Sequence, residues 1–241
     1  MKTKKKYFLL SAVLLLLVWE LLSHMTGPEH PLPGPWSTLV ATAEVLCNIS
    51  FLKTVGVTLL RSLGGFAVAI IAGGLLGFAA GLNDSVRAFM KPLIVLVRTT
   101  PVVVFVLLAI VWFTSGVVPV LIGIIMMFPI VYLNVSEGIR AVDANLVRMA
   151  RFYGIRGWRL AVEVYLPAIR PASKSAVSNA IGLGWRAIVA AEVLSQPEWG
   201  IGASMHGAQI MHQVDVLMAW ALVTVVFGAV FEKIVDYGYR A

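Results

Sequence analysis

Charge and cysteine are both scarce in this sequence. Only 13% of its 241 residues are Asp, Glu, Lys or Arg, whereas 59% are hydrophobic and the mean hydropathy is +0.89. A soluble domain usually has about one quarter charged and one half apolar residues, so disorder is excluded and a soluble globular enzyme fits poorly. The one cysteine, Cys47, has no partner for an internal disulfide, and we expect it to be a buried, inert thiol.

Catalytic and metal-binding motifs are also lacking. No G-x-x-x-x-G-K-[ST] phosphate loop is present, so we expect the chain not to bind ATP by itself. There is no His-Glu-x-x-His motif, and His206 and His212 lie six residues apart, which does not place them on one helical face. We therefore predict no metal site, and the apolar segments hold no cluster of groups that would indicate an intramembrane enzyme.

Long apolar runs fill most of the chain. A bilayer core requires about 20 apolar residues per helix, and six segments approach or exceed this length. These segments are residues 7–25, 54–82, 92–113, 117–135, 172–194 and 214–235. The sequence therefore predicts an all-α polytopic membrane protein with six transmembrane helices.

The N-terminal part, residues 1–53, is expected to be separate from a core formed by residues 54–241. The first apolar segment follows a lysine-rich tail, and the residues after it, Ser23-His24-Met25, do not form a small-x-small cleavage site. We therefore expect an uncleaved anchor helix rather than a signal peptide. Residues 36–46 have apolar side chains at helical spacing, which predicts an amphipathic helix on the membrane surface. Residues 200–213 are interpreted as a glycine-opened outer loop.

The distribution of cations predicts how the chain is oriented. Lys and Arg gather on the cytoplasmic loops of membrane proteins. If the N-terminus is cytoplasmic, most of the 19 cations fall on the cytoplasmic side, with the largest group between the fourth and fifth segments. We therefore expect both termini to be cytoplasmic.

Small residues recur every four positions in the second apolar segment. This spacing places them on one helical face, where another backbone can approach closely. The face can pack within one subunit or form a subunit interface. The helix-packing candidates are Gly65, Ala69, Gly73, Gly77 and Gly81.

Ionisable residues inside apolar segments are candidates for a substrate pathway. An intramembrane charge is costly unless it faces a cavity or finds a partner, and a proline can break the helix beside it. The alternative is that these charges pair across helices and fix their packing. The candidate pathway residues are Arg98, Thr99, Thr100, Pro101, Trp185, Arg186 and Glu192.

The basic segment 136–169 carries a pattern of known spacing. Arg148-Met149-Ala150 is followed after three residues by Gly154, and nine residues later by Val164, Tyr165 and Leu166-Pro167. The segment resembles the coupling loop of permease subunits of binding-protein-dependent ABC importers, whose motif begins Glu-Ala-Ala. Here Arg148 and Met149 depart from that motif. The resemblance implies a bent pair of helices, stopped by Pro167 before the fifth span. The ATPase-coupling candidates are Arg148, Met149, Ala150, Gly154, Leu166 and Pro167.

The resemblance extends over nearly the whole chain. Leu32-Pro33-Gly34-Pro35, Arg98 with Pro101, and Ala190-Ala191-Glu192 followed by Gly200-Ile201-Gly202 are similar to the nitrate/sulfonate/taurine branch of these permeases. It implies a type I importer core with a cytoplasmic coupling helix, in a bacterial cytoplasmic membrane.

The same resemblance implies partners and cargo. A second permease copy would complete the pathway, two cytoplasmic ABC ATPase subunits would carry the ATP and Mg²⁺, and a periplasmic or lipid-anchored binding protein would deliver substrate. No cofactor on this chain and no nucleic-acid partner are expected, and lipid surrounds the helices. The expected cargo is a small anion such as a sulfonate, taurine or nitrate. A vitamin precursor or other small organic molecule is an alternative, and a stand-alone secondary transporter is less favoured because no internal repeat is evident.

Overall fold

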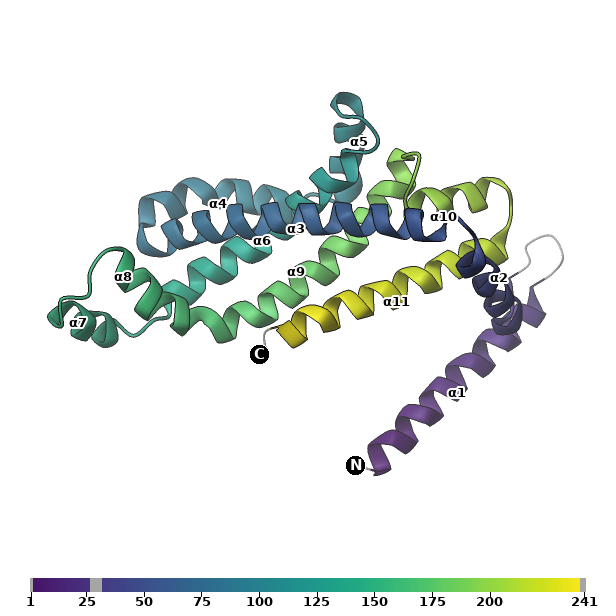
Figure 1. Cartoon of the computed structure of the whole chain (residues 1–241), viewed down its shortest axis with the longest axis horizontal. Helices are drawn as coiled ribbons and strands as arrows, with labels where there is room; N and C mark the ends of the chain where they lie inside the picture. The colour runs from purple at the N-terminus through teal and green to yellow at the C-terminus, as the bar shows by residue number, and fades with distance from the viewer. Residues whose placement is uncertain (1, 27–31, 239–241) are drawn as a thin grey trace.

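The computed structural model describes residues 2–26 and 32–238, and these fold as a bundle of helices (Figure 1). No strand occurs in these two ranges, so the predicted all-α class is confirmed. Of the family-like segment Leu32-Pro33-Gly34-Pro35, all four residues are described, whereas residues 27–31 before it lie outside the described ranges. The elements are α1 (Lys2–Met25), α2 (Pro35–Cys47), α3 (Phe51–Leu82), α4 (Asp84–Thr99), α5 (Val102–Trp112), α6 (Val118–Arg140), α7 (Ala144–Phe152), α8 (Trp158–Leu160), the π-helix η1 (Ala161–Tyr165), α9 (Leu166–Ser195), α10 (Ile201–Ile210) and α11 (Val214–Gly238).

The described residues contain fewer clear spans than predicted. Four helices are long and apolar enough to cross a membrane: α3, α6, residues 177–195 of α9 and residues 214–234 of α11. The bent pair of α4 and α5 makes a fifth if it counts as one span. In α1 the described apolar stretch is only Val13–Met25, and α1 stands apart from the bundle (Figure 1). The structure thus supports four or five spans, and the predicted count of six is not confirmed.

The third predicted span, residues 92–113, is broken. Its two halves, α4 and α5, are bent by 101° relative to each other. Proline disfavours the helical conformation of the residue before it, and Thr100 is indeed extended ahead of Pro101. The hydroxyls of Thr99 and Thr100 donate to the carbonyls of Val95 and Leu96, at 2.9 and 2.8 Å, and so satisfy the end of α4. As a result α5 projects sideways from the bundle (Figure 1).

α3 packs closely on α6 along the stripe of small residues. A Cβ atom built on Gly77 would lie 2.6 Å from the carbonyl oxygen of Tyr132, and one on Gly81 would lie 2.7 Å from the Cβ of Ile139. Because Tyr132 and Ile139 belong to α6, the stripe faces a helix of the same subunit. The residues of the stripe are Gly65, Ala69, Gly73, Gly77 and Gly81.

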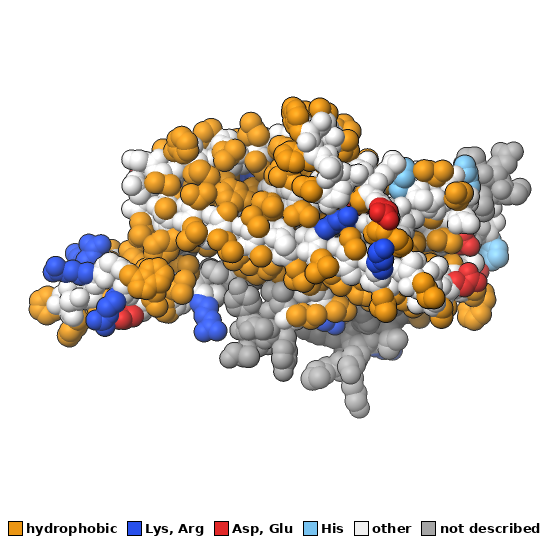
Figure 2. Space-filling view, turned by 45° about the horizontal axis from the view of Figure 1, so that its top comes forward, with side chains coloured by type: hydrophobic (Ala, Val, Ile, Leu, Met, Phe, Trp, Pro, Cys, Tyr) orange, Lys and Arg blue, Asp and Glu red, His pale blue; other side chains and the backbone are white. Residues whose placement is uncertain are grey.

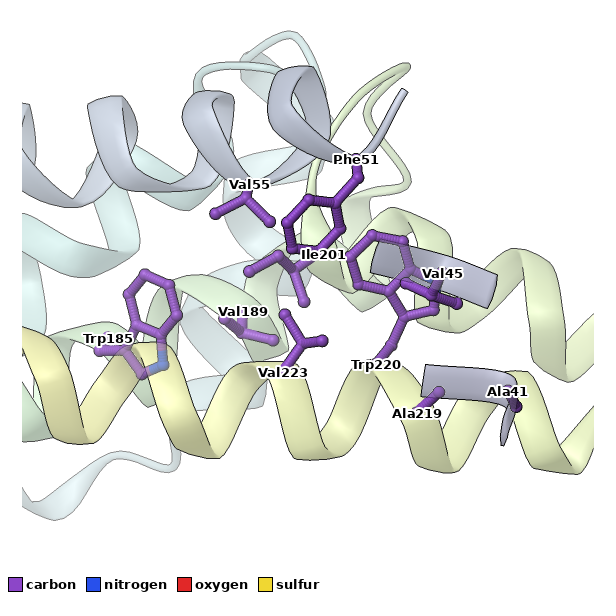
Figure 3. Packing of buried hydrophobic residues seen from close by; sticks show 10 residues of the cluster. All are labelled: Ala41, Val45, Phe51, Val55, Trp185, Val189, Ile201, Ala219, Trp220 and Val223. Atoms are coloured by element: carbon purple, nitrogen blue, oxygen red, sulfur yellow. The ribbon is translucent and has the colours of Figure 1, made fainter. Parts of the chain in front are cut away.

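α9 lies at the centre of the bundle and contacts α3, α5, α6, α10 and α11. Its buried Trp185 donates a 3.0 Å hydrogen bond from Nε1 to the carbonyl of Thr224 in α11. Phe51, at the start of α3, stacks on Trp220 of α11 with a centroid distance of 5.9 Å. The apolar cluster at this end (Figure 3) comprises Ala41, Val45, Phe51, Val55, Trp185, Val189, Ile201, Ala219, Trp220 and Val223.

The amphipathic helix predicted for residues 36–46 is present as α2. Its small and polar face, which includes Thr38 and Ala41, is buried, whereas Trp36 and Leu39 are exposed. The apolar face is therefore turned away from the protein. The prediction that Cys47 is buried is wrong, because this residue at the end of α2 is exposed.

Two local expectations are also wrong. Residues 200–213 are not a glycine-opened loop, because most of them form the helix α10, which Gly200 precedes as its N-cap residue with φ +148°. Pro167 does not stop a helix before the fifth span, since α8, η1 and α9 follow one another without an intervening loop. Pro167 lies in the first turn of α9, where the backbone changes from π- to α-helical hydrogen bonding and a missing N–H is tolerated.

We predict that Gly77→Ala lowers the stability of the protein by about 1–3 kcal/mol, the usual cost of overpacking, because the added methyl group would push α3 away from the backbone of α6. Gly74→Ala is the matched control, since a Cβ there meets nothing within 4 Å. Thermal unfolding of the two purified variants measures the difference. Equal melting temperatures for the two variants would contradict the close contact.

Candidate functional site

The first candidate region is α7, which lies at one end of the molecule beyond the long helices (Figure 1). Asp143 caps its start by accepting a 2.8 Å hydrogen bond from the backbone N–H of Asn145. Ala150 is buried on an apolar cluster that includes Leu160 and Tyr165. The opposite face is open to the exterior, and its residues include Arg148 and Met149.

Gly154 closes α7 and redirects the chain. The N–H of Ile155 donates to the carbonyl of Ala150 at 3.0 Å, and the N–H of Gly154 donates to that of Arg151 at 3.1 Å. This pair of bonds is the Schellman arrangement, which needs a left-handed residue after the helix. Gly154 has φ +81°, which explains the glycine in physical terms.

The tip of this bend presents large aromatic side chains. Phe152 is 88% exposed and Tyr153 76% exposed, and their rings pack edge to face at 5.9 Å. Trp158 is 80% exposed just after the bend. Figure 2 shows basic side chains gathered at the same end of the molecule. Exposed apolar groups beside charges are typical of a surface that binds another protein.

The other predicted coupling residues are Leu166 and Pro167. Both are exposed and lie at the start of α9, which α8 and η1 separate from the bend at Gly154. Sequence reasoning identified the segment but missed its aromatic residues Phe152, Tyr153 and Trp158. Their position beside arginines, outside every apolar run, was the available signal.

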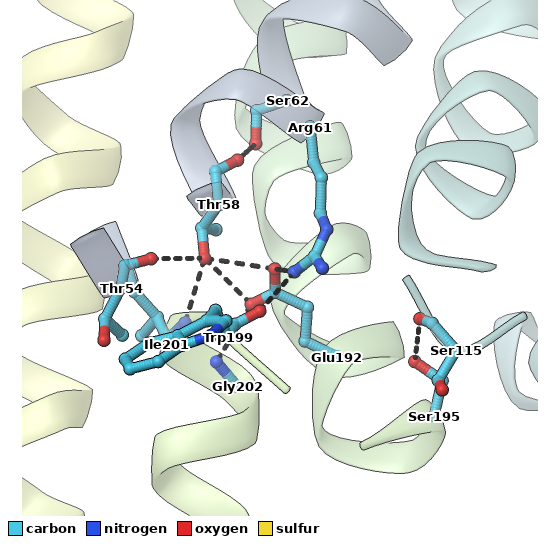
Figure 4. Close-up of polar contacts among 10 residues, drawn as sticks. All are labelled: Thr54, Thr58, Arg61, Ser62, Ser115, Glu192, Ser195, Trp199, Ile201 and Gly202. Atoms are coloured by element: carbon cyan, nitrogen blue, oxygen red, sulfur yellow. Dashed lines mark hydrogen bonds and ion pairs between the residues drawn. The ribbon is translucent and has the colours of Figure 1, made fainter. Parts of the chain in front are cut away.

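The second candidate region is a buried polar network around Glu192 (Figure 4). The Glu192 side chain is fully buried, and its carboxylate accepts from Arg61 Nη1 at 2.6 Å and from Thr58 Oγ1 at 2.9 Å. The backbone N–H of Gly202 donates to it at 3.0 Å. Removing a carboxylate from water is costly, and these three donors offset the cost.

The network joins three helices. Arg61 and Thr58 come from α3, Glu192 from α9 and Gly202 from α10, and Arg61 also donates to the carbonyl of Trp199 at 2.6 Å. These contacts support the interpretation in which charges pair across helices. Arg61 and Thr58 were missed as site residues, although polar side chains at positions 54, 58, 61 and 62 follow one face of an otherwise apolar helix.

The remaining candidates on α9 have different surroundings. Trp185 is buried against α11, as described above. Arg186 is exposed, and its Nε donates to the carbonyl of Gly182 at 2.9 Å in its own helix. Glu232 of α11 lies against Gly182.

Of the candidates at the end of α4, Arg98 lines a cavity of about 480 Å³ between α4 and α6, whereas Thr99, Thr100 and Pro101 do not. Arg98 lines it together with Arg87 and Lys91, two cations that are not among the predicted pathway residues. None of Trp185, Arg186 and Glu192 lines this cavity. The structure therefore does not bring the pathway candidates of α4 and α9 together.

The comparison with protein families decides the identity of the chain. Residues 54–241 match the family described as binding-protein-dependent transport system inner membrane component. The chain belongs to this family. It is an ABC transporter permease that spans the membrane several times, similar to the nitrate/sulfonate/taurine branch.

Individual relatives of this permease cover most of its length. The putative aliphatic sulfonates transport permease protein SsuC of Escherichia coli is 29% identical over 222 residues, which are 91% of this chain and 82% of the relative. The bicarbonate transport system permease protein CmpB of Synechococcus elongatus is 30% identical over 219 residues, which are 85% of this chain and 77% of the relative. The taurine transport system permease protein TauC of Escherichia coli is 25% identical over 236 residues, which are 95% of this chain and 84% of the relative.

We predict that Arg61→Met destabilises the permease by about 3–5 kcal/mol, because it leaves the buried carboxylate of Glu192 without its charge partner. The double variant Arg61→Met/Glu192→Leu should be clearly more stable than Arg61→Met alone. Arg170→Met, which removes an exposed cation, is the control. Thermal unfolding of the wild type, Arg61→Met, Glu192→Leu, the double variant and Arg170→Met measures the coupling, and strictly additive losses would show that the pair does not act as a unit.

Proposed function

We propose that two copies of this permease form the membrane pathway of an ATP-driven importer for a small anion, with α7 as the element that docks on a cytoplasmic ATPase. Two ATPase subunits bind and hydrolyse ATP with Mg²⁺, because the permease sequence contains no phosphate loop. A binding protein on the outer side delivers the cargo. The alternative cargo is a vitamin precursor or another small organic molecule.

The observation that carries this proposal is the exposed aromatic tip of the α7 bend. Phe152, Tyr153 and Trp158 are large aromatic side chains that no described part of the chain covers, and arginines flank them in the sequence. The tip lies in the segment that carries the coupling-loop spacing. Aromatic residues and arginine are the residue types enriched where proteins bind each other.

A movement of the docked bend can be transmitted to the membrane-spanning helices through α9. α8, η1 and α9 follow directly after the bend, and α9 ends beside the Glu192 network. A displacement of the bend by the ATPase is therefore passed along α9 to α3 and α10 at the opposite end. The proposed orientation places the α7 end and both termini in the cytoplasm, in agreement with the excess of cations there.

The names of the relatives favour an anion as cargo. Aliphatic sulfonates and bicarbonate are anions, and taurine carries a sulfonate group. The permease itself places Arg87, Lys91 and Arg98 around a cavity, which suits the passage of negative charge.

We predict that Gly154→Val reduces uptake and transport-coupled ATP hydrolysis at least tenfold, because valine does not tolerate φ +81° and the bend must open. The amount of permease in the membrane should be unchanged, since a Cβ at Gly154 meets nothing within 4 Å. Gly64→Val is the control, because this glycine of α3 is exposed and equally free of neighbours.

The measurement begins with purification of tagged permease and detection of a co-purifying ATPase. Uptake of labelled taurine, ethanesulfonate and bicarbonate is then compared in cells that express each variant. Wild-type uptake by Gly154→Val, or purification of the wild-type permease without any ATPase, would contradict the proposed docking.

A further inference from the structure

We infer that the cavity between α4 and α6 is a binding site for a small oxyanion, held by Arg87, Lys91 and Arg98 with the hydroxyl of Tyr132. The inference rests on the proposed function for the identity of the oxyanion as cargo. The site itself is argued from the side chains that line the cavity.

The cations of the cavity share one side of α4. Arg87, Lys91 and Arg98 are separated by four and seven residues, which are one and two helical turns. None of them forms an ion pair with another described residue. All three side chains are exposed, and an anion in this space would accept charge-assisted hydrogen bonds from them.

The carboxylates at the cavity do not neutralise this charge. Asp84 lines it but is already paired with Arg140, which is not among the lining residues. Glu137 is the other lining carboxylate. With Asp84 satisfied elsewhere, three cations face one carboxylate, and the cavity keeps a net positive charge.

Tyr132 gives an independent indication of a ligand. The side chain is only 2% exposed, it lines the cavity, and its hydroxyl has no hydrogen-bond partner among the described residues. A buried hydroxyl without a partner costs about 1–3 kcal/mol. An oxygen of a bound oxyanion would accept the hydrogen bond that this phenol can donate.

The size and position of the cavity restrict the ligand. A volume of about 480 Å³ holds a small molecule, at the low end of the usual range of about 300–1,000 Å³ for ligand pockets. The cations extend over about 16 Å of α4, from near its start to the break before α5. Sulfonate, bicarbonate and the phosphate of an anionic lipid share the required chemistry, which is a compact group of charged oxygens.

Binding is tested with the full-length permease in nanodiscs of phosphatidylcholine, titrated with ethanesulfonate at constant ionic strength with chloride as the balancing anion. The wild type should bind ethanesulfonate. Arg87→Gln/Lys91→Gln/Arg98→Gln should lose at least tenfold in affinity, and Tyr132→Phe about threefold. The matched control is Lys6→Gln/Arg170→Gln/Lys233→Gln, which removes three exposed cations elsewhere and should bind as the wild type does.

Nanodiscs that also contain phosphatidylglycerol distinguish the two sources of the oxyanion. Weaker ethanesulfonate binding in these discs, seen in the wild type but not in the triple cavity variant, shows that lipid phosphate also enters the site. Unchanged binding assigns the site to the soluble anion. Wild-type affinity in both the triple cavity variant and Tyr132→Phe, or no binding by the wild type in either lipid, would overturn the inference.

This experiment is independent of the ATPase. A permease that retains its ATPase but binds no oxyanion in the cavity contradicts the site alone. A permease that binds the oxyanion but retains no ATPase contradicts the proposed importer function alone.

Discussion

The buried carboxylate of Glu192 is the constraint around which one end of this permease is organised. A charge in an apolar bundle must meet its partners there, so α3 must present Arg61 and α10 must present the N–H of Gly202 at the same point. The requirement extends to the backbone, because a Cβ on Gly202 would lie 2.6 Å from the Cβ of Glu192. Three helices are thereby held in one arrangement by a single side chain.

The glycine contacts on α3 add α6 to the helices that the Glu192 network holds together. α3 is fixed to α6 along the small-residue stripe and to α9 by the Glu192 network, so these three helices form one unit. α1 lies against α2 and apart from this unit, whereas α5 projects from the bundle but packs Val106 and Ala109 on α6 and α9 (Figure 1). The proposed transmission from the α7 bend thus acts on these three helices, while α1 lies outside them.

Local sequence signals predicted much of this fold, because they report local preferences. Apolar length identified α3, α6, α9 and α11, and four-residue spacing identified the stripe on α3. Hydropathy does not encode the angle at a break, so the 101° turn after Thr99 was predicted only as an interruption. The helix α10 was missed because its glycines resemble a loop until Glu192 and Thr58 are in place to accept its first N–H groups.

For the site residues, too, the sequence predicted local features but not contacts between distant segments. The family resemblance of the segment around Gly154 implied the bend, and the structure supplies its physical basis in the left-handed conformation of Gly154. The partner of Glu192 could not be predicted, because Arg61 lies 131 residues away and only the fold brings them together. The cavity beside Arg98 likewise depends on how α4 packs against α6, which no single segment specifies.

The docking of α7 is tested most directly by cross-linking from its tip. Since Cys47 is the only cysteine, a Cys47→Ser background allows Phe152→Cys to carry a photo-reactive benzophenone, with Trp36→Cys on α2 at the other end as the comparison. The account predicts that the label at position 152 captures the ATPase subunit and that the label at position 36 does not. Capture from position 36, or none from position 152, would contradict it.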